Sequence, residues 1–285
     1  MGLIVVSAMA LGEPSIIKGS FAFQGSTPVT QGYLRMNSIG GNPLKEHIEI
    51  WMTPLNSSHP ISSYQVEMTK KIHVVVVSKD FGTFLHIHPV LGPGGLFRID
   101  QEFPAPGLYY LYADGLPNDA NHQVFRFTLT VGTPGVQKAP DLTVLPGMKD
   151  TVGPYTVSLS KGLLTVGSMD MIEVKIFKGG SPAKDLHPYL GAPGHAVFLN
   201  SRDLSYVHVH PMEMGAMAKM MGMQMAGMTP SQMQKMMPDM PDSASSPPDM
   251  ALYVSVKEQG IYKLWLQFRG GTQLYVAPFV LIANP

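Results

Sequence analysis

The sequence predicts an all-β protein made of two β-sandwiches in tandem. Short segments rich in Val, Ile, Phe and Tyr alternate with Gly, Pro, Asn and Asp, and long helical periodicity is absent. One of these segments occurs twice, which indicates two copies of one domain. A chain of 285 residues is long enough for two domains of ordinary size.

The repeated segment sets the domain organisation. HVVVVSKDFGTFLHIHP (73–89) aligns with HAVFLNSRDLSYVHVHP (195–211), and both contain two histidines one residue apart followed by proline. Downstream, PGLYYLYAD (106–114) aligns with QGIYKLWLQ (259–267). The Pro- and Gly-rich composition around 132–147 is typical of a linker. We therefore expect an N-terminal segment (1–20), a first sandwich (21–132), a linker (133–150) and a second sandwich (151–285) with a Met-rich insertion (212–250).

The N-terminal segment has two interpretations. Residues 3–9 are apolar, and Ala8-Met9-Ala10 has the small-x-small form of a signal-peptidase site, but no positive residue precedes the apolar run. We interpret the segment as a secretory signal shortened at its start, which predicts a periplasmic or secreted protein; the alternative is an apolar first strand. No stretch reaches the ~18 apolar residues of a membrane span, so we expect none.

Composition excludes several classes of protein. The net charge is zero with neutral histidines, unlike the basic surface of a nucleic-acid-binding protein. Cysteine is absent, which excludes disulfides, zinc-thiolate sites, blue-copper centres and cysteine nucleophiles. Metalloprotease, nucleophile-elbow, P-loop and dinucleotide-binding motifs are also missing. We therefore expect a protein that is not an enzyme, with a metalloenzyme as the least favoured class.

Strand geometry predicts that the histidines of each repeat converge. His86 and His88 are two residues apart, so on one strand they project from the same face. A hairpin turning at Lys79-Asp80 would place His73 directly opposite His86. In the second repeat, a turn at Ser201-Arg202 would place His195 opposite His208, with His210 on the same face. This convergence requires that both strands of each hairpin belong to one sheet.

Three neutral imidazoles are suitable ligands for Cu(II), Zn(II) or Ni(II). We consider His122 as a fourth ligand in the first domain and His187 in the second. The alternative is that the histidines are structural and form hydrogen bonds with the backbone. Because an imidazole must be neutral to bind a metal, a metal site of this kind should lose Cu(II) below about pH 6.

The insertion at 212–250 holds 13 of the 21 methionines. Its glycines, and its methionines on every side of a helical wheel, argue against a core helix, and a loop of this length is usually functional or disordered. Thioethers are soft donors that select Cu(I), although a Met-rich surface can also bind an apolar partner. The candidate Cu(I) ligands are Met212, Met214, Met217, Met220, Met221, Met223, Met225 and Met228. We expect Met212 and Met214 to lie nearest the histidines.

Both repeats resemble a known family. The segments TKKIHVVVVSKDFGTFLHIHP and DLHPYLGAPGHAVFLNSRDLSYVHVHP are similar to motifs of secreted bacterial proteins with FixH/YtkA-like, immunoglobulin-like domains. Members often accompany copper- or heavy-metal-resistance systems. The resemblance covers about residues 40–131 and 155–282 and implies an immunoglobulin-like fold and a metal-resistance setting. The Met-rich tract is an addition to the family pattern, and the missing positive residues at the N-terminus also depart from it.

Together these features predict an extracytoplasmic copper-binding protein that sequesters or carries the metal. Cu(II) would bind at the histidine triads and Cu(I) at the Met-rich tract, and zinc suits the same imidazoles. Its partners would be the metal ion and a protein that delivers or receives copper. The alternative is an interaction module in which the histidines are structural and the Met-rich tract docks on another protein.

Overall fold

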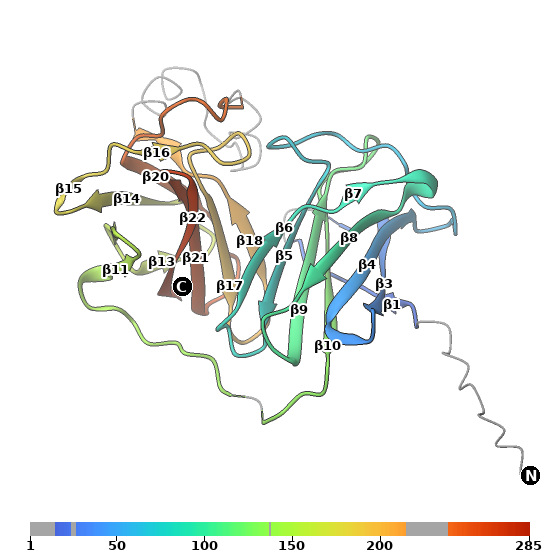
Figure 1. Cartoon of the computed structure of the whole chain (residues 1–285). Helices are drawn as coiled ribbons and strands as arrows, with labels where there is room; N and C mark the ends of the chain where they lie inside the picture. The colour runs from blue at the N-terminus through green and yellow to red at the C-terminus, as the bar shows by residue number, and fades with distance from the viewer. Residues whose placement is uncertain (1–14, 24–26, 137, 215–238) are drawn as a thin grey trace, which may run out of the picture.

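The computed structural model describes residues 15–23, 27–136, 138–214 and 239–285. The chain forms two β-sandwiches that lie side by side, which confirms the predicted all-β fold of sandwich domains (Figure 1). Short 3-10 turns occur at Pro93–Gly95 (η1) and Pro146–Met148 (η2).

The first sandwich consists of two five-stranded sheets, ordered β1-β3-β4-β8-β7 and β2-β10-β9-β5-β6. Their strands are antiparallel where they pair. The strands are β1 (Ile17–Lys18), β2 (Ser20–Phe21), β3 (Thr30–Ile39), β4 (Asn42–Pro54), β5 (Ile72–Ser78), β6 (Phe84–Ile87), β7 (Val90–Leu91), β8 (Phe97–Glu102), β9 (Gly107–Gly115) and β10 (Gln123–Val131).

The second sandwich consists of two six-stranded sheets. Their main paths are β11-β12-β14-β20-β19, with β15 beside β14, and β13-β22-β21-β17-β18, with β16 beside β21. The strands are β11 (Lys149–Val152), β12 (Tyr155–Leu159), β13 (Leu163–Thr165), β14 (Asp170–Lys178), β15 (Ser181–Pro182), β16 (Leu186–His187), β17 (His195–Asn200), β18 (Tyr206–Val209), β19 (Met212–Glu213), β20 (Asp249–Val254), β21 (Gly260–Gly270) and β22 (Gln273–Asn284).

The sandwich boundaries differ slightly from the predicted ones. β1 begins at Ile17 and pairs with β3, so the first sandwich starts inside the predicted N-terminal segment. β11 begins at Lys149, inside the predicted linker, because it pairs with β12. Residues 1–14, on which the signal-peptide interpretation depends, lie outside the described part of the chain.

The duplication extends to the order of the strands. The order β10-β9-β5-β6 in one half matches β22-β21-β17-β18 in the other. Both β5 and β17 are buried on both faces, apart from the half-buried last residue of β5. One face of each strand packs inside its own sandwich, and the other face meets the opposite domain. The continuous valine run of β5 follows from burial on both faces. A strand with one solvent-exposed face would instead alternate apolar and polar residues.

An apolar cluster joins the two sandwiches. Val75 and Val77 of β5 pack in it with Val197 and Leu199 of β17, and buried aromatic residues of both domains complete it. In Figure 1 the sheets that contain β5 and β17 accordingly face each other across the middle of the molecule. Side chains at one end of this contact can therefore come from both domains.

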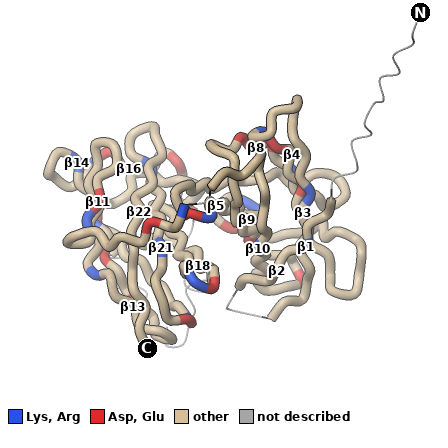
Figure 2. The backbone as a smooth tube through the Cα atoms, turned by 90° about the horizontal axis from the view of Figure 1, so that it is seen from below, with Lys and Arg blue, Asp and Glu red and all other residues tan. Residues whose placement is uncertain are grey.

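Charged residues of both signs are interspersed along both domains (Figure 2). This mixture agrees with the zero net charge of the sequence. Among the described residues, no helix has the length and apolar character needed to cross a membrane.

Candidate metal centre

The three histidines of the first repeat share one face of the β5–β6 hairpin, but in a different register from the predicted one. Val75 pairs with His86 and Val74 with Ile87, so the position opposite His73 is that of His88. The prediction that His73 lies opposite His86 is therefore wrong by two residues. The cause is the wider loop, because the Ser78 amide donates to the Thr83 carbonyl and encloses residues 79–82.

The second repeat shows the same correction. Val197 pairs with His208, so the position opposite His195 is that of His210 rather than His208. Here the Asn200 amide donates to the Ser205 carbonyl, and the loop is again wider than the predicted turn. A shift of two residues keeps every side chain on its original face. The three histidines of each repeat therefore share one face, as predicted, although the predicted register is wrong.

The two triads form one group, which the sequence did not predict. The ring centroids of His86 and His195, from different domains, are 4.8 Å apart, and those of His86 and His208 are 5.3 Å apart. His73 lies 5.6 Å from His208 by the same measure. We call the six residues the six-histidine centre: His73, His86, His88, His195, His208 and His210.

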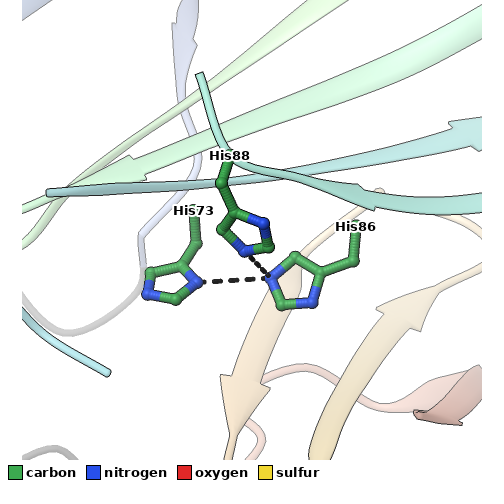
Figure 3. Close-up of side chains that lie close together, drawn as sticks. All are labelled: His73, His86 and His88. Carbon is green, nitrogen blue, oxygen red and sulfur yellow. Dashed lines mark hydrogen bonds between the residues drawn. The ribbon is translucent and has the colours of Figure 1, made fainter. Parts of the chain in front are cut away.

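Two sets of three histidines within the centre have ligand nitrogens close enough to hold one ion. His73, His86 and His88 form the first set (Figure 3), and His86, His195 and His208 form the second. Within each set the nitrogens all lie within 4.8 Å of one another. His86 belongs to both sets, so it is the link between the triad of one domain and that of the other.

Outer hydrogen bonds fix which nitrogen of each ring faces the centre. His73 Nε2 donates to the Glu67 carbonyl (2.9 Å), which leaves Nδ1 as the bare nitrogen of a neutral ring. His86 Nδ1 donates to the Gln267 side-chain oxygen (3.0 Å), which leaves Nε2 bare. In the second domain, His195 Nε2 donates to the Tyr189 carbonyl (2.9 Å) and leaves Nδ1 bare.

The inner nitrogens of the rings lie at distances typical of metal ligands. His73 Nδ1 lies 3.3 Å from His86 Nε2, and His88 Nε2 lies 3.2 Å from that same atom (Figure 3). His195 Nδ1 lies 3.3 Å from His208 Nε2. A tetrahedral ion with metal–nitrogen bonds of about 2.0–2.1 Å holds its ligands roughly 3.3 Å apart. His73 Nδ1 and His86 Nε2 are both bare, so no proton lies between them, and a cation there would turn repulsion into attraction.

Burial keeps these imidazoles neutral. It lowers the pKa of His73 to about 4, and the neighbouring His208 adds to the effect. Burial likewise lowers the pKa of His88 to about 3, with further contributions from His73 and Lys70. The pKa values of His86 and His195 are also well below that of a free imidazole, first through burial and then through neighbouring histidines. Neutral imidazole is the form that binds metals.

His122 does not join the centre. Its Nδ1 lies 3.0 Å from an Asp114 carboxylate oxygen, and its Nε2 lies 2.8 Å from a Glu67 carboxylate oxygen. Burial opposes its charged form, but these carboxylates outweigh burial and raise the pKa of His122 to about 10. The ring is therefore a cation with both nitrogens engaged, and it cannot act as the fourth ligand we considered. His187 is also elsewhere: its Nδ1 contacts the Ala244 carbonyl at 3.1 Å.

Asp114 and Gln267 occupy equivalent positions behind the two triads. Asp114 pairs with His73 across β9 and β5, and Gln267 pairs with His195 across β21 and β17. Each reaches into the opposite domain: Gln267 accepts from His86, and an Asp114 oxygen lies 3.9 Å from His208 Nδ1. Burial disfavours a charged Asp114, but His122 and His208 outweigh it and hold the pKa of the carboxyl far below its usual range.

Sequence reasoning missed both of these residues, although a signal was present. Asp114 and Gln267 are the last residues of the aligned segments PGLYYLYAD and QGIYKLWLQ. Two stacked aromatic pairs also join the domains. Phe84 of the first domain stacks on Trp265 of the second (5.4 Å), and Tyr206 of the second stacks on Tyr112 of the first (4.6 Å). The contact between the domains therefore has approximate twofold symmetry with unequal chemistry in its two halves.

The structure describes only the ends of the methionine tract. Met212 is buried in β19 and lines a cavity together with His210, whereas Met214 is exposed. Met212 and His210 therefore share one cavity, and the expectation that Met212 and Met214 are the ligands nearest the histidines stays a prediction. The other candidate Cu(I) ligands lie outside the described residues: Met217, Met220, Met221, Met223, Met225 and Met228.

Fold and site define a class: a two-domain β-sandwich protein with a buried polyhistidine site between its domains. The chain belongs to a family described as a domain of unknown function, DUF8832, whose model matches residues 43–133 and 150–285. No curated protein matches the chain.

Two solved structures of bacterial macroglobulins are similar to the chain at a low level. The elastase-activated Escherichia coli alpha-2-macroglobulin is 8% identical over 90% of this chain, with a TM-score of 0.22. A Salmonella alpha-2-macroglobulin variant is 11% identical over 94% of it, with a TM-score of 0.24. The chain spans only 24% and 15% of the length of these two proteins, and a likeness this weak carries no argument about function.

Proposed function

We propose that the protein binds copper in the six-histidine centre and sequesters or transfers it outside the cytoplasm. One observation carries the proposal: imidazoles from two domains gather at one place, and within each domain their inner nitrogens lie 3.2–3.3 Å apart. Their outer nitrogens are held by carbonyl and amide oxygens, as those of metal-binding histidines usually are. A purely structural role would not require six imidazoles at one place, four of them with a pKa lowered by burial.

The ligand types favour copper. Imidazole suits copper, zinc and nickel, and the stability order places Cu(II) above the other two. Met212 lines a cavity beside His210, and a soft thioether near the imidazoles suits Cu(I) but not zinc. Both oxidation states of copper therefore find suitable ligands within one region. Zinc remains the competitor at the imidazoles.

Storage or transfer of the ion fits the site better than catalysis. His73, His86 and His195 are buried between the domains, so an ion held by them would be shielded from solvent. The acidic residue nearest the centre, Asp114, is already paired with His122 and so is not a free general base. A location outside the cytoplasm agrees with a chain that has methionines but no cysteines, because thioethers resist oxidation that thiols do not.

The test is metal analysis of the untagged protein, followed by competition titrations with Cu(II) and Zn(II). The double variant His86→Ala/His208→Ala should lose tight Cu(II) binding. A matched control is His59→Ala, because His59 is a surface histidine that contacts only Ser57 among the described residues. Wild-type protein that binds no copper, together with a double variant that only loses folding stability, would replace this proposal with the interaction module in which the histidines are structural.

A further inference from the structure

A cavity of about 380 Å³ lies against the six-histidine centre. His210 lines it, and the same ring lies 4.5 Å from His195 and 4.6 Å from His208 between centroids. One side chain therefore belongs both to the cavity wall and to the centre. An ion in the cavity would have His210 as its nearest imidazole.

Three methionines from separate parts of the chain line this cavity: Met68, Met212 and Met240. Met68 comes from the first domain, whereas Met212 and Met240 come from the second. Met68 and Met212 are 8% and 7% exposed, yet neither belongs to any of the three apolar cores. Met52 and Met250, by contrast, are core residues in their own sandwiches. The buried thioethers at the cavity are therefore not explained by core packing.

The backbone fixes each of the three methionines. Met68 and Thr69 form a tight turn at φ 45° and 64°, closed by hydrogen bonds between the backbones of Glu67 and Lys70. Two consecutive residues other than glycine in this left-handed region cost about 1 kcal/mol or more each. The equivalent turn of the second domain, 189–192, uses Gly191 at one of these positions. The first domain thus keeps a strained turn whose Glu67 carbonyl holds His73 and whose Met68 lines the cavity.

Met212 and Met240, the other two methionines of the cavity, are held by the backbone of the second domain. The Met240 amide donates to the Gly191 carbonyl (2.8 Å), and Met212 lies in β19, paired with Ala251 of β20. Among the described residues that line the cavity, Glu213 is the single carboxylate and no lysine or arginine occurs. The wall therefore offers thioethers, one imidazole and one negative charge, which together favour a monovalent soft cation over a hard divalent one.

We infer that this thioether cavity is a loading site for Cu(I), where Met68, Met212 and Met240 receive the ion before it passes to His210. The inference rests on the proposed copper function, because the ion would pass, still as Cu(I), to an imidazole of the six-histidine centre. The transfer is an exchange of ligands at constant oxidation state, so it requires no oxidant or reductant.

The test uses Ag(I), which has the charge and softness of Cu(I), and the full-length chain with methyl-labelled methionine. One equivalent of Ag(I) should shift the methyl resonances of all three methionines together in the NMR spectrum. The variant Met68→Leu/Met212→Leu/Met240→Leu, which keeps side-chain volume, should bind Ag(I) roughly tenfold more weakly or worse, since even the loss of an outer partner costs a metal site about that much. The matched control is Met169→Leu/Met171→Leu, because both of these methionines are exposed.

Co(II) absorbance of the same proteins reports on the imidazoles alone and should not differ between the triple variant and wild type. The loading site is excluded if Ag(I) shifts only other methionines, or if the triple variant binds Ag(I) as tightly as the control does. If Co(II) fails to bind wild-type protein, the six-histidine centre is excluded instead, whatever Ag(I) does. The two failures are therefore distinguishable.

Discussion

The two histidine triads have the same register and the same strand positions, but different groups stand behind them. Behind His86 lies the neutral amide of Gln267, and behind His208 lies the carboxylate of Asp114, which pairs with the cationic His122. The second triad also adjoins the thioether cavity through His210. Duplication of one domain has therefore kept the imidazoles, while the residues around them differ in charge and softness.

This difference shows that two separate constraints act on the site. Strand register places the imidazoles, whereas the packing of the two domains places the groups behind them. The imidazoles lie on one face of the β5–β6 and β17–β18 hairpins, and the packing of β5 and β17 on both faces fixes the register that holds them there. Their outer partners come from the opposite domain and depend on how the sandwiches pack. The two halves can therefore bind an ion with unequal strength even though their triads are equivalent.

The largest expected effect concerns the buried ion pair behind the second triad, between Asp114 and His122. Asp114→Asn removes a buried carboxylate that pairs with His122, which then has Glu67 as its remaining carboxylate partner. Breaking a buried ion pair typically costs about 3–5 kcal/mol, so the free energy of unfolding of the metal-free protein should fall by roughly that amount at neutral pH. Urea denaturation measures it. The surface control is Asp100→Asn, which removes the exposed partner of His47 and should change little. Equal losses in the two variants would contradict the ion-pair interpretation.

The pH dependence of stability should separate the first histidine triad from the ion pair of His122 with Asp114. Below about pH 6.5 the unfolded chain protonates the residue at position 73, but the folded chain does not, because the pKa of His73 is about 4. The contribution of His73 to the stability of the metal-free protein should therefore fall by about 3 kcal/mol between pH 6.5 and 4, and the other buried imidazoles act in the same direction. His122, whose folded pKa is about 10, contributes stability that is fully present below pH 6.5 and is lost as the pH rises toward 10.

Denaturation curves across this range provide the measurement. His122→Gln should flatten the fall in the free energy of unfolding at alkaline pH and leave the fall at acidic pH unchanged. If the variant changes both equally, the two falls do not arise from His122 and the buried imidazoles separately. Since burial keeps His73 and His88 neutral to lower pH than a free imidazole, metal binding should also persist below the pH 6 expected from sequence.

The third prediction uses the residue shared by the two sets of ligands. His86→Ala removes a ligand from both sets, whereas His88→Ala removes one from the first set alone. We expect Cu(II) affinity to fall roughly a hundredfold or more for His86→Ala and by clearly less for His88→Ala, since the loss of an outer partner alone costs about 10–100-fold. Competition titration against a chromophoric chelator measures both. Equal losses would show that the triads act as two independent sites.

A fourth prediction concerns a variant in which a carboxylate stands behind each of the two triads. Gln267→Glu places a carboxylate behind His86, where its charge increases the basicity of the ring toward a metal. Cu(II) affinity should rise roughly tenfold, while the metal-free protein loses stability because the added charge is buried. Gln267→Leu removes the acceptor instead and should lower affinity in the same titration. An unchanged affinity in both variants would mean that this contact has no effect on the ion.

The smallest expected effect concerns the stacked tyrosines beside the second triad. The Tyr112 hydroxyl donates to the Leu204 carbonyl (2.9 Å), whereas the buried Tyr206 hydroxyl has no hydrogen-bond partner among the described residues. Tyr112→Phe should cost about 1 kcal/mol of folding free energy, and Tyr206→Phe should be neutral or slightly stabilising. Thermal unfolding of the two variants compares them directly. The opposite order would show that the Tyr206 hydroxyl has a partner that this arrangement does not reveal.

Particular residues show where sequence reasoning succeeded and where it failed. Alternate spacing placed His86 and His88 on one face, and this held although the turn at Lys79-Asp80 was wrong. The loop was wider because Phe81 takes a left-handed conformation at φ 58°, which its sequence does not signal. His122 was predicted as a ligand from its position alone, but the carboxylates that engage it are brought there by strand pairing and by a distant turn.

The sequence by itself determined the fold class, the duplication and the convergence of each triad, because strand periodicity and a repeated pattern are local properties of the chain. Only the tertiary structure decided that the two triads meet, that Asp114 and Gln267 reach across to the opposite domain, and that Met68 lines the same cavity as His210. These contacts depend on how the sheets that contain β5 and β17, the strands buried on both faces, pack together. That packing is set by the complementary shapes of many side chains at once, which no single segment of sequence contains.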